Sequence, residues 1–84
     1  MGISFAIDIR PLFRKVDVDH MRPFEILLDD HTYMSDPQQD HKNAHDVQDF
    51  LTGQRKPRMP LGGTYWSADQ LDLYARWMTD GYLP

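Results

Sequence analysis

The clearest pattern of apolar and polar positions lies near the end of the chain. Large apolar residues recur there at helical spacing, with charged residues mostly on the other faces: Leu71, Tyr74, Trp77 and Met78. Ser67 and Gln70 stand at the spacing of a capping box, and Gly81 follows the last turn as a C-cap. The pattern predicts a helix that begins after Ser67 and ends before Gly81, with one face in the core.

The stretch before this helix contains strong turn-forming residues. Pro57 and Pro60 fix their own φ angles and push the residues before them toward extended backbone. The Gly62-Gly63 pair permits backbone angles that other residues avoid. We expect a stiff, non-helical approach over residues 56–59, followed by a turn at the two glycines.

A second amphipathic pattern runs from about Asp40 to Thr52, and Gly53 supplies its stop signal. Its predicted buried face consists of four residues at helical spacing: Ala44, Val47, Phe50 and Leu51.

A third apolar pattern lies between Ser4 and Lys15, again at core-facing helical positions: Phe5, Ile9, Leu12 and Phe13. Proline is tolerated only in the first turn of a helix, so Pro11 favours a start near Asp8, with Phe5 packed just before it.

The remaining segments carry weaker patterns. The apolar run over residues 24–28 suits an extended segment across the core, but no second alternating run exists to pair with it. Residues 29–40 are polar and rich in turn formers, with Tyr33 and Met34 as a single-turn anchor. The sequence therefore predicts an all-α fold: one domain over residues 1–84 with three main helices and long irregular connections.

Composition narrows the class of protein. The 84 residues include no cysteine, which excludes disulfides, thiolate metal sites and cysteine nucleophiles. A net charge of −4, with Arg55, Lys56 and Arg58 as the one basic cluster, argues against nucleic acid as a partner. No segment has the ~20 apolar residues of a bilayer span, and no signal peptide is recognisable. We expect a cytoplasmic protein that does not enter membranes.

Two histidines are the main candidates for metal chemistry. His41 and His45 are four residues apart on the predicted helix, so both rings lie on one face, with Asp49 one turn further. The alternative is a solvated polar face, because the pair lacks the glutamate of a protease motif. No pair of nucleophile and base can be named, so we do not expect an enzyme.

The two ends of the chain also share motifs with a known family. The chain opens with Phe5-x-x-Asp8-Ile9-Arg10-Pro11-Leu12-Phe13. It closes with Met59-Pro60-x-Gly62-Gly63 and Trp66-Ser67-x-x-Gln70-Leu71-x-Leu73-Tyr74-x-x-Trp77-Met78-x-x-Gly81-x-x-Pro84. Together these motifs resemble the small c-type cytochrome domains of bacterial proteins. In that family a first helix leads to Cys-x-x-Cys-His, and a Met-Pro loop supplies the sixth iron ligand before the last helix.

The haem-attachment motif is missing from this chain. Its place is taken by Asp17-Val18-Asp19-His20-Met21, so covalent haem is excluded. The resemblance thus implies a haem-free, cytochrome-c-like domain. Such a domain needs bulk in place of the cofactor, and the sequence offers many large aromatic residues for it: Phe13, Phe24, Tyr33, Phe50, Trp66, Tyr74 and Trp77.

Two functions of different classes follow. The first is a non-catalytic accessory module or small subunit without cofactor, which docks on a larger enzyme through surface aromatic residues: Tyr65, Trp66 and Tyr82. The alternative is an electron-transfer protein that holds haem or a transition metal without covalent attachment. Its ligands would be Met59 with Met21, or His20, or the His41 and His45 pair.

Overall fold

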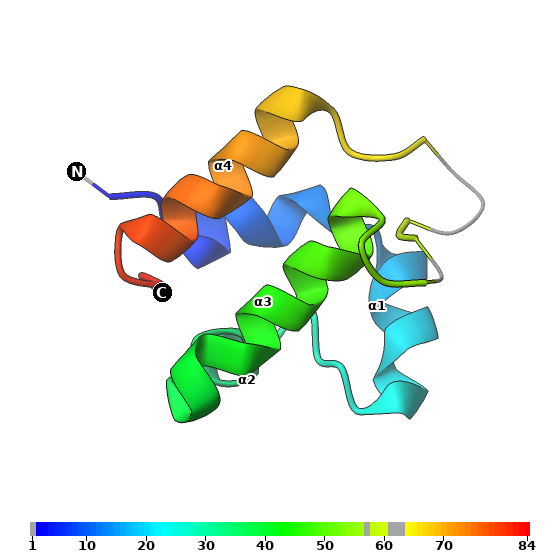
Figure 1. Ribbon diagram of the computed structural model, residues 1–84, viewed down its shortest axis with the longest axis horizontal. Helices are drawn as coiled ribbons and strands as arrows, with labels where there is room; N and C mark the ends of the chain where they lie inside the picture. Colours follow the sequence, from blue (N-terminus) through cyan, green and yellow to red (C-terminus); the bar gives the residue numbers. More distant parts are fainter. Residues whose placement is uncertain (1, 57, 61–63) are drawn as a thin grey trace.

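The computed structural model describes residues 2–56, 58–60 and 64–84 (Figure 1). Within these ranges every regular element is helical and no strand is present, which confirms the all-α class. In chain order the elements are η1 (Phe5–Ile9), η2 (Arg10–Leu12), α1 (Lys15–Met21), η3 (Arg22–Phe24), α2 (His31–Met34), α3 (Gln38–Thr52) and α4 (Ala68–Thr79). None of the described helices is long and apolar enough to cross a membrane. The turn expected at Gly62-Gly63 and the effect of Pro57 lie outside the described residues.

Helix α4 begins as its capping box predicts. The backbone N–H of Gln70 donates to Oγ of Ser67 (3.2 Å), and the N–H of Ser67 donates to Oε1 of Gln70 (2.8 Å). These two bonds satisfy donors that the first turn of a helix leaves without partners. The helix ends at Thr79, and Gly81 then takes a left-handed backbone conformation with φ 103°.

Helix α3 also buries the face that the sequence predicts, and Gly53 ends it with φ 86°. Its first turn is irregular: Gln39, Asp40 and His41 have φ angles of 54°, 56° and 60°, in the left-handed region. The regular right-handed helix therefore begins only at Lys42. His41 thus precedes the regular helix, whereas His45 lies within it.

The predicted start of the first helix near Asp8 is wrong. Helical turns begin at Phe5, because the Ser4 hydroxyl accepts from the N–H of Ile7 (3.3 Å) and the Asp8 carboxylate accepts from the N–H of Ser4 (2.8 Å). Pro11 then lies within the 3₁₀ turn η2. A separate helix, α1, begins at Lys15, in a stretch for which no helix was predicted.

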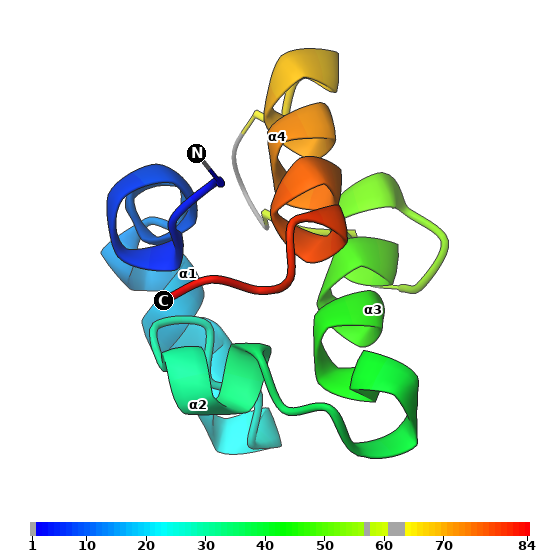
Figure 2. The ribbon, with the colours of Figure 1, turned by 90° about the vertical axis from the view of Figure 1, so that its left-hand side faces the viewer.

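The two ends of the chain are joined by hydrogen bonds. The N–H of Phe5 and the indole N–H of Trp77 both donate to the carbonyl of Leu83, at 3.0 and 2.8 Å. Figure 2 shows the C-terminal segment, in red, turning back from α4 toward the N-terminal segment in blue. Helix α4 packs against η1, to which these bonds connect it, and also against α3.

A row of aromatic rings runs through the core. Successive ring centroids lie 5.1 to 6.2 Å apart along the series Phe13, Trp66, Tyr74, Trp77, Phe5 and His31. Among the aromatic residues expected to fill the interior, Phe24 is an exception, with 64% of its surface exposed. Pro23 keeps this part of the chain in a short 3₁₀ turn, η3, at the surface.

Candidate functional site

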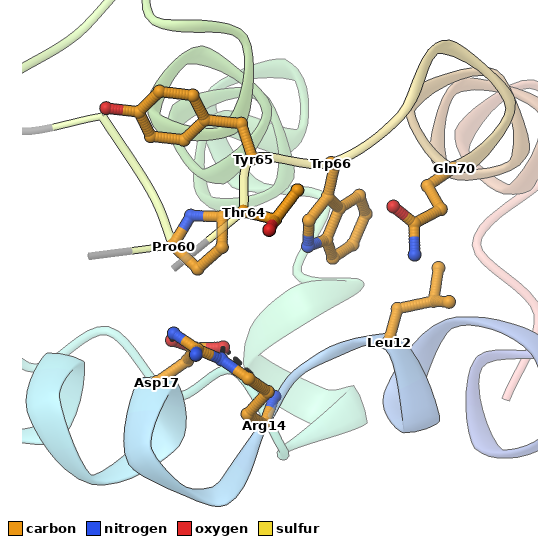
Figure 3. Close-up of a pocket in the computed structure, with 8 residues that line it drawn as sticks. All are labelled: Leu12, Arg14, Asp17, Pro60, Thr64, Tyr65, Trp66 and Gln70. Atoms are coloured by element: carbon orange, nitrogen blue, oxygen red, sulfur yellow. Dashed lines mark hydrogen bonds and ion pairs between the residues drawn. The ribbon is translucent and has the colours of Figure 1, made fainter. Parts of the chain in front are cut away.

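A pocket of about 380 Å³ opens between the start of α1 and the segment that leads into α4 (Figure 3). We call it the Trp66 pocket, and its lining residues are Leu12, Arg14, Asp17, Pro60, Thr64, Tyr65, Trp66 and Gln70. Its volume lies within the range of about 300 to 1,000 Å³ that is usual for ligand pockets.

One wall of the Trp66 pocket carries an ion pair. The Asp17 side chain is only 7% exposed, and its carboxylate accepts from the backbone N–H (3.0 Å), Nε (3.0 Å) and Nη2 (2.8 Å) of Arg14. The hydrogen bond with Asp17 raises the pKa of the Arg14 guanidinium. Because the two charges cancel, this wall is polar but has no net charge.

The opposite wall is formed by Trp66. The residue is 7% exposed, and its ring packs against Phe13 and Tyr74, with centroids 5.1 and 6.2 Å away. Figure 3 shows the indole nitrogen on the ring edge that faces Arg14 and Asp17. Within the described ranges this N–H donates no hydrogen bond, whereas that of Trp77 is bonded to Leu83. The pocket therefore contains a hydrogen-bond donor that has no acceptor among the described residues.

Tyr65 is the most exposed aromatic residue of the lining, and it contacts Arg58. Tyr65 is 48% exposed, and the Arg58 guanidinium lies 4.2 Å from its ring centroid, at cation–π distance. The Tyr65 hydroxyl points away from the pocket in Figure 3. The tyrosine thus presents a partly exposed aromatic surface at the pocket mouth.

The structure brings together two of the three predicted partner-binding residues, Tyr65 and Trp66. The expectation that Trp66 lies on the surface is wrong, because its ring is part of the aromatic row and only its N–H edge faces the pocket. Tyr82 lies elsewhere and is partly buried. It stacks on His41 at 3.8 Å between ring centroids, and its carbonyl accepts from Nε2 of His31 (2.7 Å).

The prediction that His41 and His45 lie on one face of a regular helix is wrong. His41 lies in the left-handed turn, so the helical spacing that would place it on the face of His45 does not apply. His45 instead lines a hollow of about 270 Å³ beside Met78 and Tyr82. In the part of the chain that the structure describes, no group of three or more histidine or acidic side chains is placed to hold a metal ion.

The residues expected to ligate haem are separated between core and surface. Met21 and Met59 each have 3% of their surface exposed and belong to the core, whereas His20 is exposed. A second hollow, of about 230 Å³, has an almost wholly apolar lining; we call it the Phe24 hollow, formed by His20, Met21, Phe24, Ile26, Phe50 and Lys56. Met59 is not among its lining residues.

The Arg14 and Asp17 pair was missed by sequence reasoning. Both residues belong to the unpredicted start of α1, where few apolar positions repeat. A local signal existed: Asp17 stands three residues after Arg14, the spacing at which a side chain returns to the backbone N–H before a helix.

Comparisons with known proteins give no family for this chain. No protein-family model matches it, and no match was found among curated proteins or solved structures.

Proposed function

We propose that this chain is a non-catalytic binding module, an accessory protein or small subunit that docks on a larger protein, such as an enzyme, through the Trp66 pocket. The observation that carries the proposal is the indole N–H of Trp66, which faces the pocket without an acceptor in the described residues. The N–H is not among the buried atoms that lack a partner, so it is open to solvent, and a bound ligand that supplies an acceptor replaces water as its partner.

The polar groups of the pocket favour binding over catalysis. The Asp17 carboxylate already accepts three hydrogen bonds from Arg14, so it is not directed at a substrate as a general base. Thr64 and Tyr65 are the hydroxyl residues of the described lining; the Tyr65 hydroxyl points away from the pocket in Figure 3, and no histidine is among the lining residues to activate Thr64.

We also propose that the fold derives from that of the c-type cytochrome domains, which the two ends of the chain resemble. Five of the aromatic residues expected to replace haem are buried: Phe13, Phe50, Trp66, Tyr74 and Trp77. Packed rings in the interior are what a cytochrome-like domain without its cofactor requires, because an unfilled cavity would cost several kcal/mol.

The second candidate is non-covalent binding of haem or a transition metal in electron transfer. The observation in its favour is that His20 and Met21 line the same Phe24 hollow. The residues do not fit haem well: the hollow of about 230 Å³ is below the usual range for ligand pockets, and Met59 lies outside its lining. We therefore prefer the binding module.

Site-directed photo-crosslinking in cells tests the preferred function. A photoreactive phenylalanine analogue replaces Tyr65 at the pocket mouth, or Ile7, which is 77% exposed on η1, as the matched control. We expect one defined adduct from position 65 that is absent from position 7 and that weakens when Trp66→Phe is added. Equal adducts from both positions, or none from position 65, would contradict a partner at this pocket.

A visible absorption spectrum and native mass spectrometry of the same purified protein test the second candidate. An apo mass without a Soret band removes the haem alternative. A mass excess that matches haem or a metal ion would overturn the binding-module proposal, and His20→Ala and Met21→Leu would then locate the ligands.

A further inference from the structure

The charge balance of the Trp66 pocket indicates what kind of ligand it accepts. Arg14 and Asp17 neutralise each other at 2.8 Å, so neither an anion nor a cation finds an opposite charge that is still available on this wall. Moving an ion from water into a partly buried site without such a charge is unfavourable. An uncharged polar group therefore fits this wall better than an ionised one.

The Trp66 N–H indicates that the ligand group in the pocket is a hydrogen-bond acceptor. Indole nitrogen is a donor only, so its partner must be an oxygen such as a peptide carbonyl. Carbonyls in helices and sheets are already used within those elements. In polyproline II conformation the backbone has no internal hydrogen bonds, so every carbonyl is available to a partner.

The remaining lining combines the polar side chains of Thr64 and Gln70 with three apolar or aromatic surfaces against which a proline ring can pack. These surfaces belong to Pro60, Tyr65 and Leu12, which line the same pocket as the indole. Grooves lined by aromatic residues bind proline-rich segments because these segments are preformed and lose little conformational entropy on binding.

We propose that the Trp66 pocket binds an extended, proline-containing segment of the partner protein, with a main-chain carbonyl accepting the Trp66 N–H and a proline ring against Tyr65 and Pro60. This inference rests on the proposed function and adds the chemical class of the bound segment. Its test is designed so that the two can fail separately.

Nuclear magnetic resonance of uniformly ¹⁵N-labelled protein provides the measurement. The chain has two tryptophans, and hence two indole N–H signals. That of Trp77 is bonded to Leu83 in the interior and serves as an internal control. The probes are an end-blocked peptide of ten prolines, an end-blocked peptide of alternating alanine and proline, and a glycine-serine peptide of equal length.

We expect at least one proline peptide to shift the Trp66 signal in a saturable manner, while the Trp77 signal and the glycine-serine titration remain unchanged. Trp66→Phe keeps an aromatic ring but removes the donor, and it should weaken binding about two- to tenfold, the equivalent of one hydrogen bond. Tyr65→Ala removes the half-exposed ring at the pocket mouth without disturbing the core, and should weaken binding at least as much.

Three results would overturn the inference: no shift of the Trp66 signal with either proline peptide at millimolar concentration, an equal shift with the glycine-serine peptide, or unchanged affinity of Tyr65→Ala. If the crosslinked partner nevertheless shifts the Trp66 signal, the ligand class is wrong and the binding module stands. If position 65 also captures no partner, both proposals fail.

Discussion

The hydroxyl of Tyr74 offers a quantitative test of how the two longest helices are joined. The side chain lies on α4, is 1% exposed, and donates a 2.8 Å hydrogen bond to the carbonyl of Ala44 on α3. Burial, followed by the charges of Tyr82 and Tyr33 when ionised, raises the Tyr74 pKa well above its usual value. Tyr74→Phe removes the hydroxyl and leaves the ring in place.

At pH 7 we expect Tyr74→Phe to lower the free energy of unfolding by about 1 kcal/mol, the net value of one hydrogen bond between neutral groups. For a domain of this size such a loss lowers Tm by roughly 4 to 8 °C. The ring contacts with Trp66 and Trp77 do not depend on the hydroxyl, so little cavity cost is added.

The pH dependence gives the sharper prediction. The pKa of Tyr74 is raised in the folded state. The contribution of its neutral hydroxyl to the free energy of unfolding is therefore fully present below the pKa of about 10 in the unfolded chain, and it is lost as pH rises above that pKa. Above pH ~10 the wild type loses about 1.4 kcal/mol per pH unit through this group, whereas Tyr74→Phe does not. The two stabilities should therefore converge and then cross near pH ~11.

Urea unfolding followed by circular dichroism between pH 7 and 11 measures both effects. Tyr65→Phe is the matched control: that residue is 48% exposed, and its substitution should change stability by less than about 0.5 kcal/mol at pH 7. A mutant as stable as wild type at pH 7, or a stability difference that stays constant up to pH 11, would refute the role assigned to the Tyr74 hydroxyl.

Three further substitutions test other parts of the structure. Ser67→Ala removes the cap of α4 and should lower the free energy of unfolding by about 1 kcal/mol in urea titrations. Ser67→Asp should keep most of the stability that the cap provides, so equal losses in the two variants would argue against the cap. Asp17→Asn weakens the acceptor of Arg14 and should lower the free energy of unfolding in the same assay, whereas a neutral result would mean that the pair adds nothing to stability. Phe24→Ser changes an exposed ring and should alter Tm by only a few degrees while leaving the Trp66 signal responsive to proline peptides; loss of that response would place binding at the Phe24 hollow instead.

The two amphipathic helices were predictable because their signals are local. In α4 the period of apolar residues and the Ser67 to Gln70 capping box both lie within a few residues of the helix start. In α3 the buried face and the Gly53 stop were equally visible. The left-handed turn over residues 39–41 was not, because no glycine marks it.

The N-terminal region was harder to predict because its helices are irregular and short. Pro11 predicts a helix start near Asp8, yet a 3₁₀ turn accommodates the proline and helical turns begin earlier, at Phe5. Helix α1 has only seven residues, with Val18 and Met21 as its buried apolar side chains, which is too few to give a clear period.

The sequence by itself determined the all-α class, the two main amphipathic helices with their buried faces, and the exclusion of covalent haem. These features depend on residue type and on spacing within a few turns of the chain. The tertiary structure decided that Trp66 is buried with its N–H toward Arg14 and Asp17, that Phe24 is exposed, and that His41 stacks on Tyr82. The physical reason is that burial and partner choice depend on which distant segments pack together, and local spacing carries no record of that packing.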